Sequence, residues 1–350
     1  SGGMENQTVS FINNANLDLM IHELAHQWFG NMITCGSWHD IFLSEGFATY
    51  CEMLAAEKEI VESQDPQQWR TAMINMACSN PHGTVYVAND KSHHEIFNYS
   101  TTYAKGAMVV HTLRKELGDQ VFFRCIKSYI SNPLNKYKNT SIKDLFRAIR
   151  IISGRNLDWF TQQWIYGSGY PQYHIIWQQN YDGLIDMQIN QTVSDTSVSF
   201  FRGKIPLMLH GYNGEKTYYV FNNNSPRQHI TINPKINVKY IEFDPYKDVL
   251  QIGSTVEQAK FANNAVSIKK EPSGNLKVSF PEDYSFDWYI IRSANNSSIK
   301  FRQPIGGMHR FEISTSELPE GQYILIMEGS EYYSTTINVS KKRSKNGHGG

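Results

Sequence analysis

The chain has 350 residues, of which 33 are acidic and 33 basic, so its formal net charge is zero. A neutral chain has no overall field that would attract nucleic acid or an anionic membrane. No apolar run approaches the ~20 residues that a bilayer crossing needs. We therefore expect a soluble protein with no transmembrane segment and no nucleic-acid partner, long enough for two or three domains.

The four cysteines are Cys35, Cys51, Cys78 and Cys125, and they form no CxxC pair. Thiolate metal sites usually use closely spaced pairs. We therefore predict free, partly buried thiols, although spacing alone does not fix the disulfide state.

The apolar spacing is helical from residue 16 to about residue 169. The predicted helices cover residues 18–31, 45–60, 103–117, 119–130 and 141–153. Gly118 followed by Asp119 is typical of one helix ending and the next being capped. We expect residues 1–170 to form one mostly helical domain.

After residue 169 the apolar period changes to two, which is typical of strands. The predicted strands cover residues 173–177, 184–192, 205–209, 217–221, 239–243, 276–280, 288–291, 311–314 and 323–328. Asn213 and Gly214 mark a hairpin turn, and residues 253–264 are a looser polar stretch. The chain is thus predicted to be a multidomain α+β protein, with β-sandwiches at 171–253 and 264–342 and a disordered tail at 343–350.

The segment IHELAHQWFG places His22 and His26 four residues apart, on one face of the first helix. Two imidazoles in this arrangement can bind one ion. Catalytic zinc takes three protein ligands and keeps an open position, and Glu45, after eighteen intervening residues, is the candidate third ligand. Glu23 lies beside the first histidine and suits a general base that takes a proton from zinc-activated water.

Two other interpretations of this pattern are a chance HExxH and a structural zinc site. A chance match becomes rare once a glutamate at the position of Glu45 is also required. Structural zinc sites are usually closed by four ligands and rich in cysteine. Both considerations favour one catalytic zinc ion.

The zinc helix, Glu45 and the opening segment GGMEN together resemble the gluzincin aminopeptidases, the family of aminopeptidase N and leukotriene hydrolase. The resemblance implies that Gly2, Gly3, Met4, Glu5 and Asn6 form the substrate-binding motif. It also implies that Glu5 binds the free amino terminus of a peptide. A charge pair at a fixed distance from the metal would allow attack only at the first peptide bond.

The segment YAKGA resembles the family's YxKGA motif, whose tyrosine donates to the developing oxyanion. Tyr103 is the predicted donor, and Tyr99 is a weaker competitor. Ser100, Thr101 and Thr102 are candidate caps for a helix that begins at Tyr103.

The resemblance extends over about residues 1–252, through WFTQQWIYGSGYP and IEFDPYKDVL. It implies a thermolysin-like catalytic domain followed by a β-sandwich. Family members more often have asparagine where Ser44 precedes Glu45, which would change the hydrogen bonds behind the ligand. The family's preceding β domain and later helical domain find no match, so we expect an N-terminally truncated catalytic domain from a longer precursor.

The last β module, with Leu318, Pro319, Gly321 and Tyr323 before a final hairpin, resembles the sorting domain of type IX secretion in the Bacteroidetes. This resemblance implies contact with secretion machinery and a secreted or cell-surface bacterial protein. An accessory sandwich that binds a carbohydrate or a protein is the alternative, and without export the protein would be cytoplasmic.

The sequence thus predicts a zinc metallo-aminopeptidase that acts on peptides with a free amino terminus. A zinc endopeptidase and a non-catalytic surface binding protein on a peptidase scaffold are the alternatives. The side-chain preference, the oligomeric state, the physiological substrate and the activity of this chain alone are left open.

Overall fold

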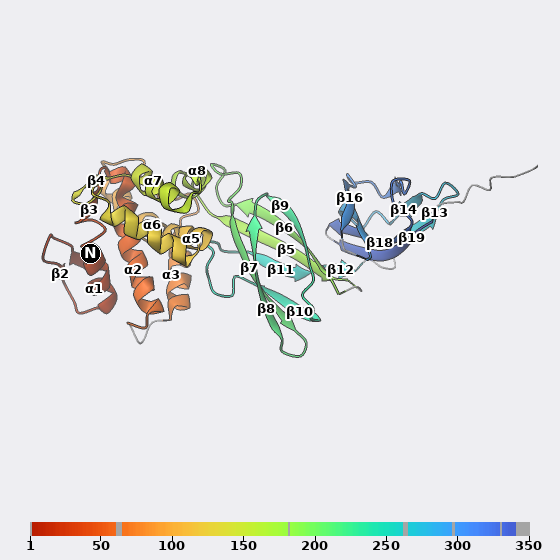
Figure 1. Cartoon of the computed structure of the whole chain (residues 1–350), viewed down its shortest axis with the longest axis horizontal. Coiled ribbons are helices and arrows are strands. Elements are labelled where there is room, and N and C mark those ends of the chain that lie inside the picture. Colours follow the sequence, from red (N-terminus) through yellow and green to blue (C-terminus); the bar gives the residue numbers. More distant parts are fainter. Residues whose placement is uncertain are drawn as a thin grey trace, which may run out of the picture. The chain divides into compact units, whose positions relative to one another are not determined.

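The computed structural model describes residues 2–60, 65–180, 183–261, 265–295, 298–329 and 331–340. Helices fill the first half and sheets the second half (Figure 1). The predicted mixed α+β class is confirmed. With 30% helix and 33% strand, however, "mostly helical" is wrong for the chain as a whole. In the described ranges, none of the helices is both long and apolar enough to cross a membrane.

The helical part contains eight α-helices and three 3₁₀ or π segments among the described residues. They are α1 (Leu17–Ala25), η1 (Trp38–Leu43), α2 (Glu45–Glu57), α3 (Pro66–Cys78), α4 (His93–Ile96), η2 (Tyr99–Lys105), α5 (Gly106–Leu117), α6 (Asp119–Ser131), α7 (Ile142–Ser153), α8 (Asp158–Phe160) and η3 (Thr161–Tyr166). Two short strand pairs accompany them: β1 (Gly3–Met4) with β2 (Phe11–Ile12), and β3 (Ile33–Cys35) with β4 (Lys138–Thr140).

Several helix boundaries differ from the prediction, including the end of α2 at Glu57, and α3 was not predicted; two differences lie at the site. The first helix ends at Ala25 rather than at residue 31, because the chain turns through Gly30, whose φ of 137° is outside the helical range. The helix predicted to begin at Tyr103 is preceded by the π-helix η2, which begins four residues earlier. Its cap is Asn98, whose side chain accepts from the Ser100 backbone N–H at 3.0 Å, and not the predicted Ser100–Thr102 group.

The helices enclose one hydrophobic core. Side chains from α2, α5, α6 and α7 are buried in it, among them Tyr50, Met108, Phe122 and Leu145. As predicted, α5 ends at Gly118, which has a φ of 79°. Ser141 and Asp144 form a capping box at the start of α7. The four cysteines are free, as predicted.

Residues after 170 form sheets. Their strands are β5 (Pro171–Gln179), β6 (Ile185–Val193), β7 (Gly203–Gly211), β8 (Lys216–Asn223), β9 (Arg227–Ile232), β10 (Val238–Phe243), β11 (Thr255–Gln258), β12 (Lys260–Phe261), β13 (Ser267–Lys270), β14 (Leu276–Ser279), β15 (Phe286–Ser293), β16 (Ile299–Pro304), β17 (Arg310–Ile313), β18 (Gly321–Gly329) and β19 (Glu331–Val339). The sheet orders are β11-β5-β6-β9, β10-β7-β8, β12-β19-β18-β15-β16 and β13-β14-β17, and β12 pairs with β19 in parallel.

The polar stretch predicted as a separator, residues 253–264, contains the short strands β11 and β12. The chain divides into two compact units, 1–175 with 189–228 and 241–255, and 176–188 with 229–240 and 256–350. The boundary between these units runs through β5 and β6. The predicted domain boundaries at 170, 253 and 264 stay predictions, and the predicted disordered tail lies outside the described residues.

Candidate metal centre

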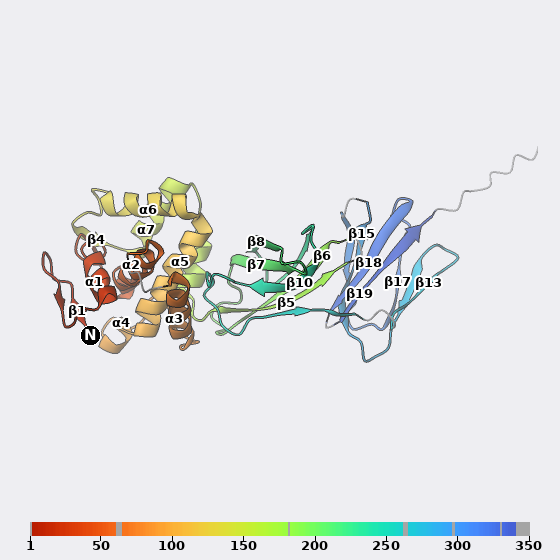
Figure 2. The same cartoon turned by 90° about the horizontal axis from the view of Figure 1, so that it is seen from below.

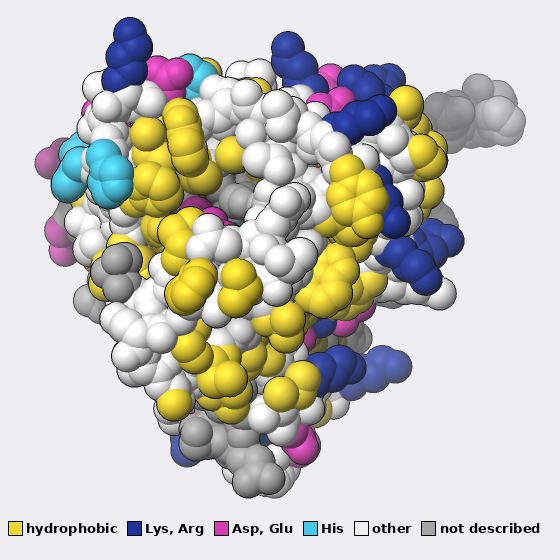
Figure 3. Space-filling model, turned by 90° about the vertical axis from the view of Figure 1, so that its left-hand side faces the viewer, with side chains coloured by type: hydrophobic (Ala, Val, Ile, Leu, Met, Phe, Trp, Pro, Cys, Tyr) yellow, Lys and Arg dark blue, Asp and Glu magenta, His cyan; other side chains and the backbone are white. Residues whose placement is uncertain are grey.

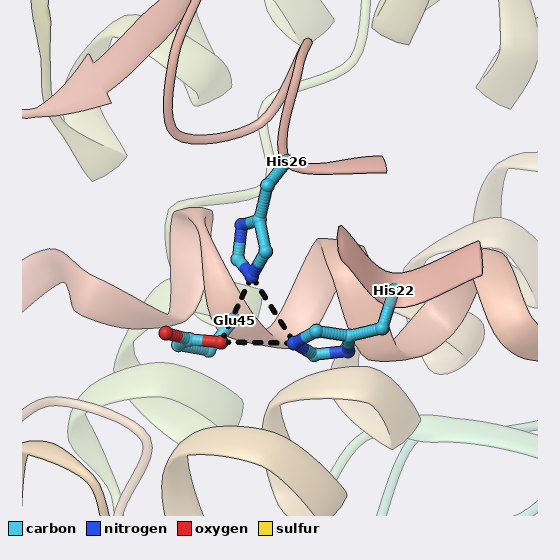
Figure 4. Close-up of side chains that lie close together, drawn as sticks. All are labelled: His22, His26 and Glu45. Atoms are coloured by element: carbon cyan, nitrogen blue, oxygen red, sulfur yellow. Dashed lines mark hydrogen bonds and ion pairs between the residues drawn. The ribbon is translucent and has the colours of Figure 1, made fainter. Parts of the chain in front are cut away.

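The structure brings His22, His26 and Glu45 together at one point (Figure 4). The Nε2 atoms of the two histidines are 3.1 Å apart, and each lies 3.2 Å from Oε2 of Glu45. A tetrahedral ion with bonds of about 2.0–2.1 Å separates its ligand atoms by roughly 3.3 Å. The three donor atoms therefore already have the spacing that zinc requires.

Helix geometry accounts for this arrangement. His22 and His26 lie one turn apart, with His26 at the end of α1, so both rings leave the same face. Glu45 is the first residue of α2, and the two helices pack against each other. The spacing HExxH therefore fixes two ligands locally, whereas the third depends on the packing of α2 against α1.

Each imidazole is oriented by a hydrogen bond from its other nitrogen. Nδ1 of His22 donates to Oε1 of Glu52 at 2.9 Å, and Nδ1 of His26 donates to the carbonyl of Phe29 at 2.9 Å. These bonds leave both Nε2 atoms free to bind a cation, which is how ligand histidines are usually held. Ser44 donates to the same Phe29 carbonyl at 3.1 Å, so its side chain takes part in the hydrogen bonds behind the ligands.

Glu52 is a residue of the site that the motif analysis missed. It lies on α2, seven residues and two turns after Glu45, so it shares a helix face with this ligand. Its second oxygen accepts from the indole of Trp69 at 3.3 Å. The helical spacing of Glu45 and Glu52 is the signal that could have identified it.

The charges of the site favour a cation. Burial alone would lower the pKa of His22, but the carboxylates of Glu45 and Glu52 outweigh burial and raise this pKa to about 10. Burial works against ionisation of Glu45 as well, yet His22 and His26 lower the pKa of its carboxyl to about 2. Glu45 is therefore a carboxylate at any working pH, and the imidazoles lie in a field that attracts positive charge.

Glu23 lies beside the ligands on α1. It is 5% exposed, and its Oε2 has no hydrogen-bond partner among the described residues. Burial raises the pKa of its carboxyl, and the two neighbouring histidines oppose this effect. A buried, unpaired carboxylate next to a metal site has the position and the free acceptor of a general base.

Gly3 packs directly on Glu23. A Cβ atom at this position would overlap the carboxyl group of Glu23, so a larger residue would displace this carboxyl. Asn31 holds the next residues, because its side-chain amide donates to the Glu5 carbonyl at 2.8 Å. Figure 2 shows β1 and α1 close together at the N-terminal end, in agreement with their contacts.

The GGMEN segment thereby places Glu5 at the metal centre. One carboxylate oxygen of Glu5, one of Glu23 and a ring nitrogen of His26 all lie within 4.8 Å of one another. Gly2 is tied to the hairpin by the Asn13 N–H, which donates to its carbonyl at 2.9 Å. Met4 is 50% exposed and Asn6 is exposed, so these two residues form the rim rather than the centre.

Tyr103 lies against His22. Their ring centroids are 6.1 Å apart with an interplanar angle of 23°. Burial raises the pKa of the Tyr103 hydroxyl, and the negative charge of Glu45 adds to this effect. The hydroxyl is therefore protonated and can donate. Tyr99 stacks on Tyr103 at 5.5 Å but is 49% exposed, further from the ligands.

Lys105 anchors the segment that carries Tyr103. Its side chain is 2% exposed, and its Nζ donates to the carbonyl of Gly83 at 2.6 Å. Burial lowers the pKa of this amine to about 7. In the sequence Lys105 stands out only as part of YAKGA, whereas the structure shows that its buried amine links η2 to the loop at Gly83.

Two histidines one turn apart, a glutamate beside the first and a second glutamate from another helix form the set of residues that HExxH zinc peptidases use. Residues 1–164 match the model of the Peptidase family M1 domain, so this part of the chain is similar to that family. The zinc expected from the sequence agrees with this match and with the donor set.

Named relatives share this region. Aminopeptidase N of Lactococcus lactis is 31% identical over 160 residues, which cover 44% of this chain and 19% of the relative. Aminopeptidase M1 of Arabidopsis thaliana is 30% identical over 197 residues, which cover 55% of this chain and 22% of the relative. The chain thus spans about a fifth of the length of these relatives.

A solved structure shows a similar fold. The aminopeptidase A of Legionella pneumophila, in complex with aspartic acid, aligns with a TM-score of 0.60 at 14% identity. The alignment covers 74% of this chain and 30% of the other. At this identity the similarity concerns the fold alone.

Proposed function

We propose that this chain is a zinc-dependent aminopeptidase that hydrolyses the first peptide bond of peptides with a free amino terminus. The observation that carries the proposal is the position of Glu5 within 4.8 Å of Glu23 and His26. A metal centre with HExxH alone would also suit an endopeptidase. A further carboxylate beside the base provides a partner for an α-ammonium group at a fixed distance from the metal.

Each group has a distinct role in this proposal. When bound, zinc would act as a Lewis acid at the scissile carbonyl and raise the acidity of water. Glu23 accepts a proton from the attacking water at its free Oε2 and later delivers it to the leaving amine. The Tyr103 hydroxyl donates to the oxygen on which negative charge develops. Glu5 binds the amino terminus and so selects the bond that is cut.

The surface around the centre supports a peptide substrate. Figure 3 shows this end of the molecule, where hydrophobic side chains border part of a hollow in which acidic side chains are visible. The exposed apolar residues of the N-terminal segment include Met4, Phe11, Met20, Leu24 and Trp28. An acidic floor suits the charged amino group of a peptide, and an apolar rim suits its side chains.

Replacing Glu5 by glutamine is expected to raise KM for peptides with a free amino terminus far more than for acetylated peptides. The reason is the loss of the charge partner, since the amide keeps the shape of the side chain but not its charge. Steady-state kinetics on matched free and acetylated peptides measure this difference. Equal effects on the two substrate classes would contradict the role of Glu5.

A non-catalytic scaffold would be expected to have lost a metal ligand or the general base, and this chain has lost neither. His22, His26, Glu45 and Glu23 are all present and lie together. An endopeptidase remains the nearest competitor, and the Glu5 variant distinguishes it.

We further propose that the last β module is a sorting address of the type IX kind and that the protein acts outside a bacterial cell or on its surface. The support is a module with its own core, which includes Leu318 and Tyr323. It ends in the β18–β19 hairpin. The Tyr323 hydroxyl donates to the Pro319 carbonyl at 2.9 Å, which fixes the turn before the last strands.

A further inference from the structure

The backbones of α2 and α5 touch beside the metal centre, at Gly46 and Gly106. A Cβ atom on Gly46 would lie 3.0 Å from the Gly106 carbonyl carbon and 3.1 Å from its Cα. A Cβ atom on Gly106 would lie 3.1 Å from the Gly46 Cα. The atoms in contact belong to the main chain, so no side-chain rotation can relieve the crowding. Any larger residue must move the two helices apart.

This contact lies between two groups of the site. Gly46 directly follows the ligand Glu45 at the start of α2. Gly106 begins α5, one turn after Tyr103, and its N–H donates to the carbonyls of Thr101 and Tyr103. The Lys105 anchor holds the preceding segment on the loop at Gly83. A displacement of α5 from α2 would therefore change the distance between Glu45 and Tyr103.

We propose that Gly46 and Gly106 are positioning residues, whose backbone contact sets the distance from the Tyr103 hydroxyl to the metal centre. This inference rests on the proposed function, because it assigns Tyr103 the oxyanion contact. A methyl group at either position requires a shift of a few tenths of an ångström. A displacement of about 1 Å can cost 10²-fold in rate, so we expect a loss of roughly 3- to 10-fold.

The test is a double-mutant cycle that does not depend on turnover. The probe is a peptide phosphonate, whose tetrahedral oxygens mimic the transition state. Its Kd is measured by calorimetry for the zinc-loaded chain, Gly46→Ala, Tyr103→Phe and the double variant. We expect Gly46→Ala to weaken binding roughly 3- to 10-fold in the parent chain and less than about twofold when Tyr103 is already phenylalanine.

Two outcomes would overturn the inference. They are equal weakening in both backgrounds, and no weakening by Gly46→Ala while the variant is folded. Zinc content and thermal melting are measured in parallel, and loss of zinc from Gly46→Ala would show that it acts through Glu45 instead. Gly106→Ala tests the reciprocal side of the contact and replaces Gly46→Ala if the latter does not fold.

A matched control is Ala56→Ser, which adds one heavy atom to a buried position of α2 ten residues further along. It is expected to leave phosphonate affinity unchanged. Because the readout is binding, a chain that cleaves no peptide but follows this pattern would refute the aminopeptidase and keep the inference. An active chain in which Gly46→Ala leaves the phosphonate affinity unaltered would support the aminopeptidase and refute the inference.

Discussion

Glu23→Gln is expected to lower kcat by about 10²- to 10⁴-fold, the range for removal of a positioned general base. Glutamine keeps the size of the side chain but cannot accept the proton of the attacking water. Since Oε2 of Glu23 has no hydrogen-bond partner among the described residues, the substitution leaves no described group unpaired. Zinc binding and the free energy of unfolding are therefore expected to change little.

The measurement combines steady-state kinetics with metal analysis and thermal melting of the same preparations. Glu23→Asp serves as the matched control, because it keeps the charge and withdraws it by one methylene group. We expect intermediate turnover for this variant. If Glu23→Gln retained zinc and its turnover stayed within tenfold of the parent chain, another group would have to be the general base.

Tyr103→Phe is expected to lower kcat about 10²- to 10³-fold, or ~2.7–4 kcal/mol, by analogy with the loss of one oxyanion donor. The ring remains, so the stacking on His22 and on Tyr99 is kept. Only the hydroxyl is lost, and KM is expected to change much less than kcat because the bond forms mainly in the transition state. Kinetics on one unblocked peptide measure both constants.

Tyr99→Phe is the matched control for this prediction. Tyr99 is stacked on Tyr103 but half exposed, and its hydroxyl is expected to contribute little to turnover. If Tyr99→Phe lost the activity while Tyr103→Phe kept it, the oxyanion contact would belong to Tyr99.

The candidate site could be predicted largely from sequence because its motifs encode geometry. A four-residue spacing on a helix fixes two histidines on one face, and the approach of Glu45 needed only the packing of its helix against the first. The Phe29 carbonyl that orients His26 was beyond prediction, since a backbone group has no residue signature. It becomes available because α1 ends at Ala25 and the chain turns at Gly30, and helical periodicity does not report such an early end.

The π-helix before α5 also escaped prediction. Apolar spacing indicates a helix but does not distinguish a π-helical turn from an α-helical one, so the start was placed at Tyr103 rather than at Tyr99. In the second half, strands with buried alternate residues such as β5 and β7 were found, whereas β19 was missed although it is largely buried. Strands such as β13 and β16 were missed, because both are mainly exposed and lack the alternation that reveals a half-buried strand.

The central claim, that the chain is a zinc aminopeptidase, is tested most directly with matched peptides bearing free and acetylated amino termini. The chain is treated with a chelator and assayed with and without added zinc. Cleavage that requires zinc and occurs only with the free amino terminus is the predicted result. Cleavage of both peptides would contradict the account in favour of an endopeptidase, and cleavage of neither, with zinc bound, in favour of a non-catalytic scaffold.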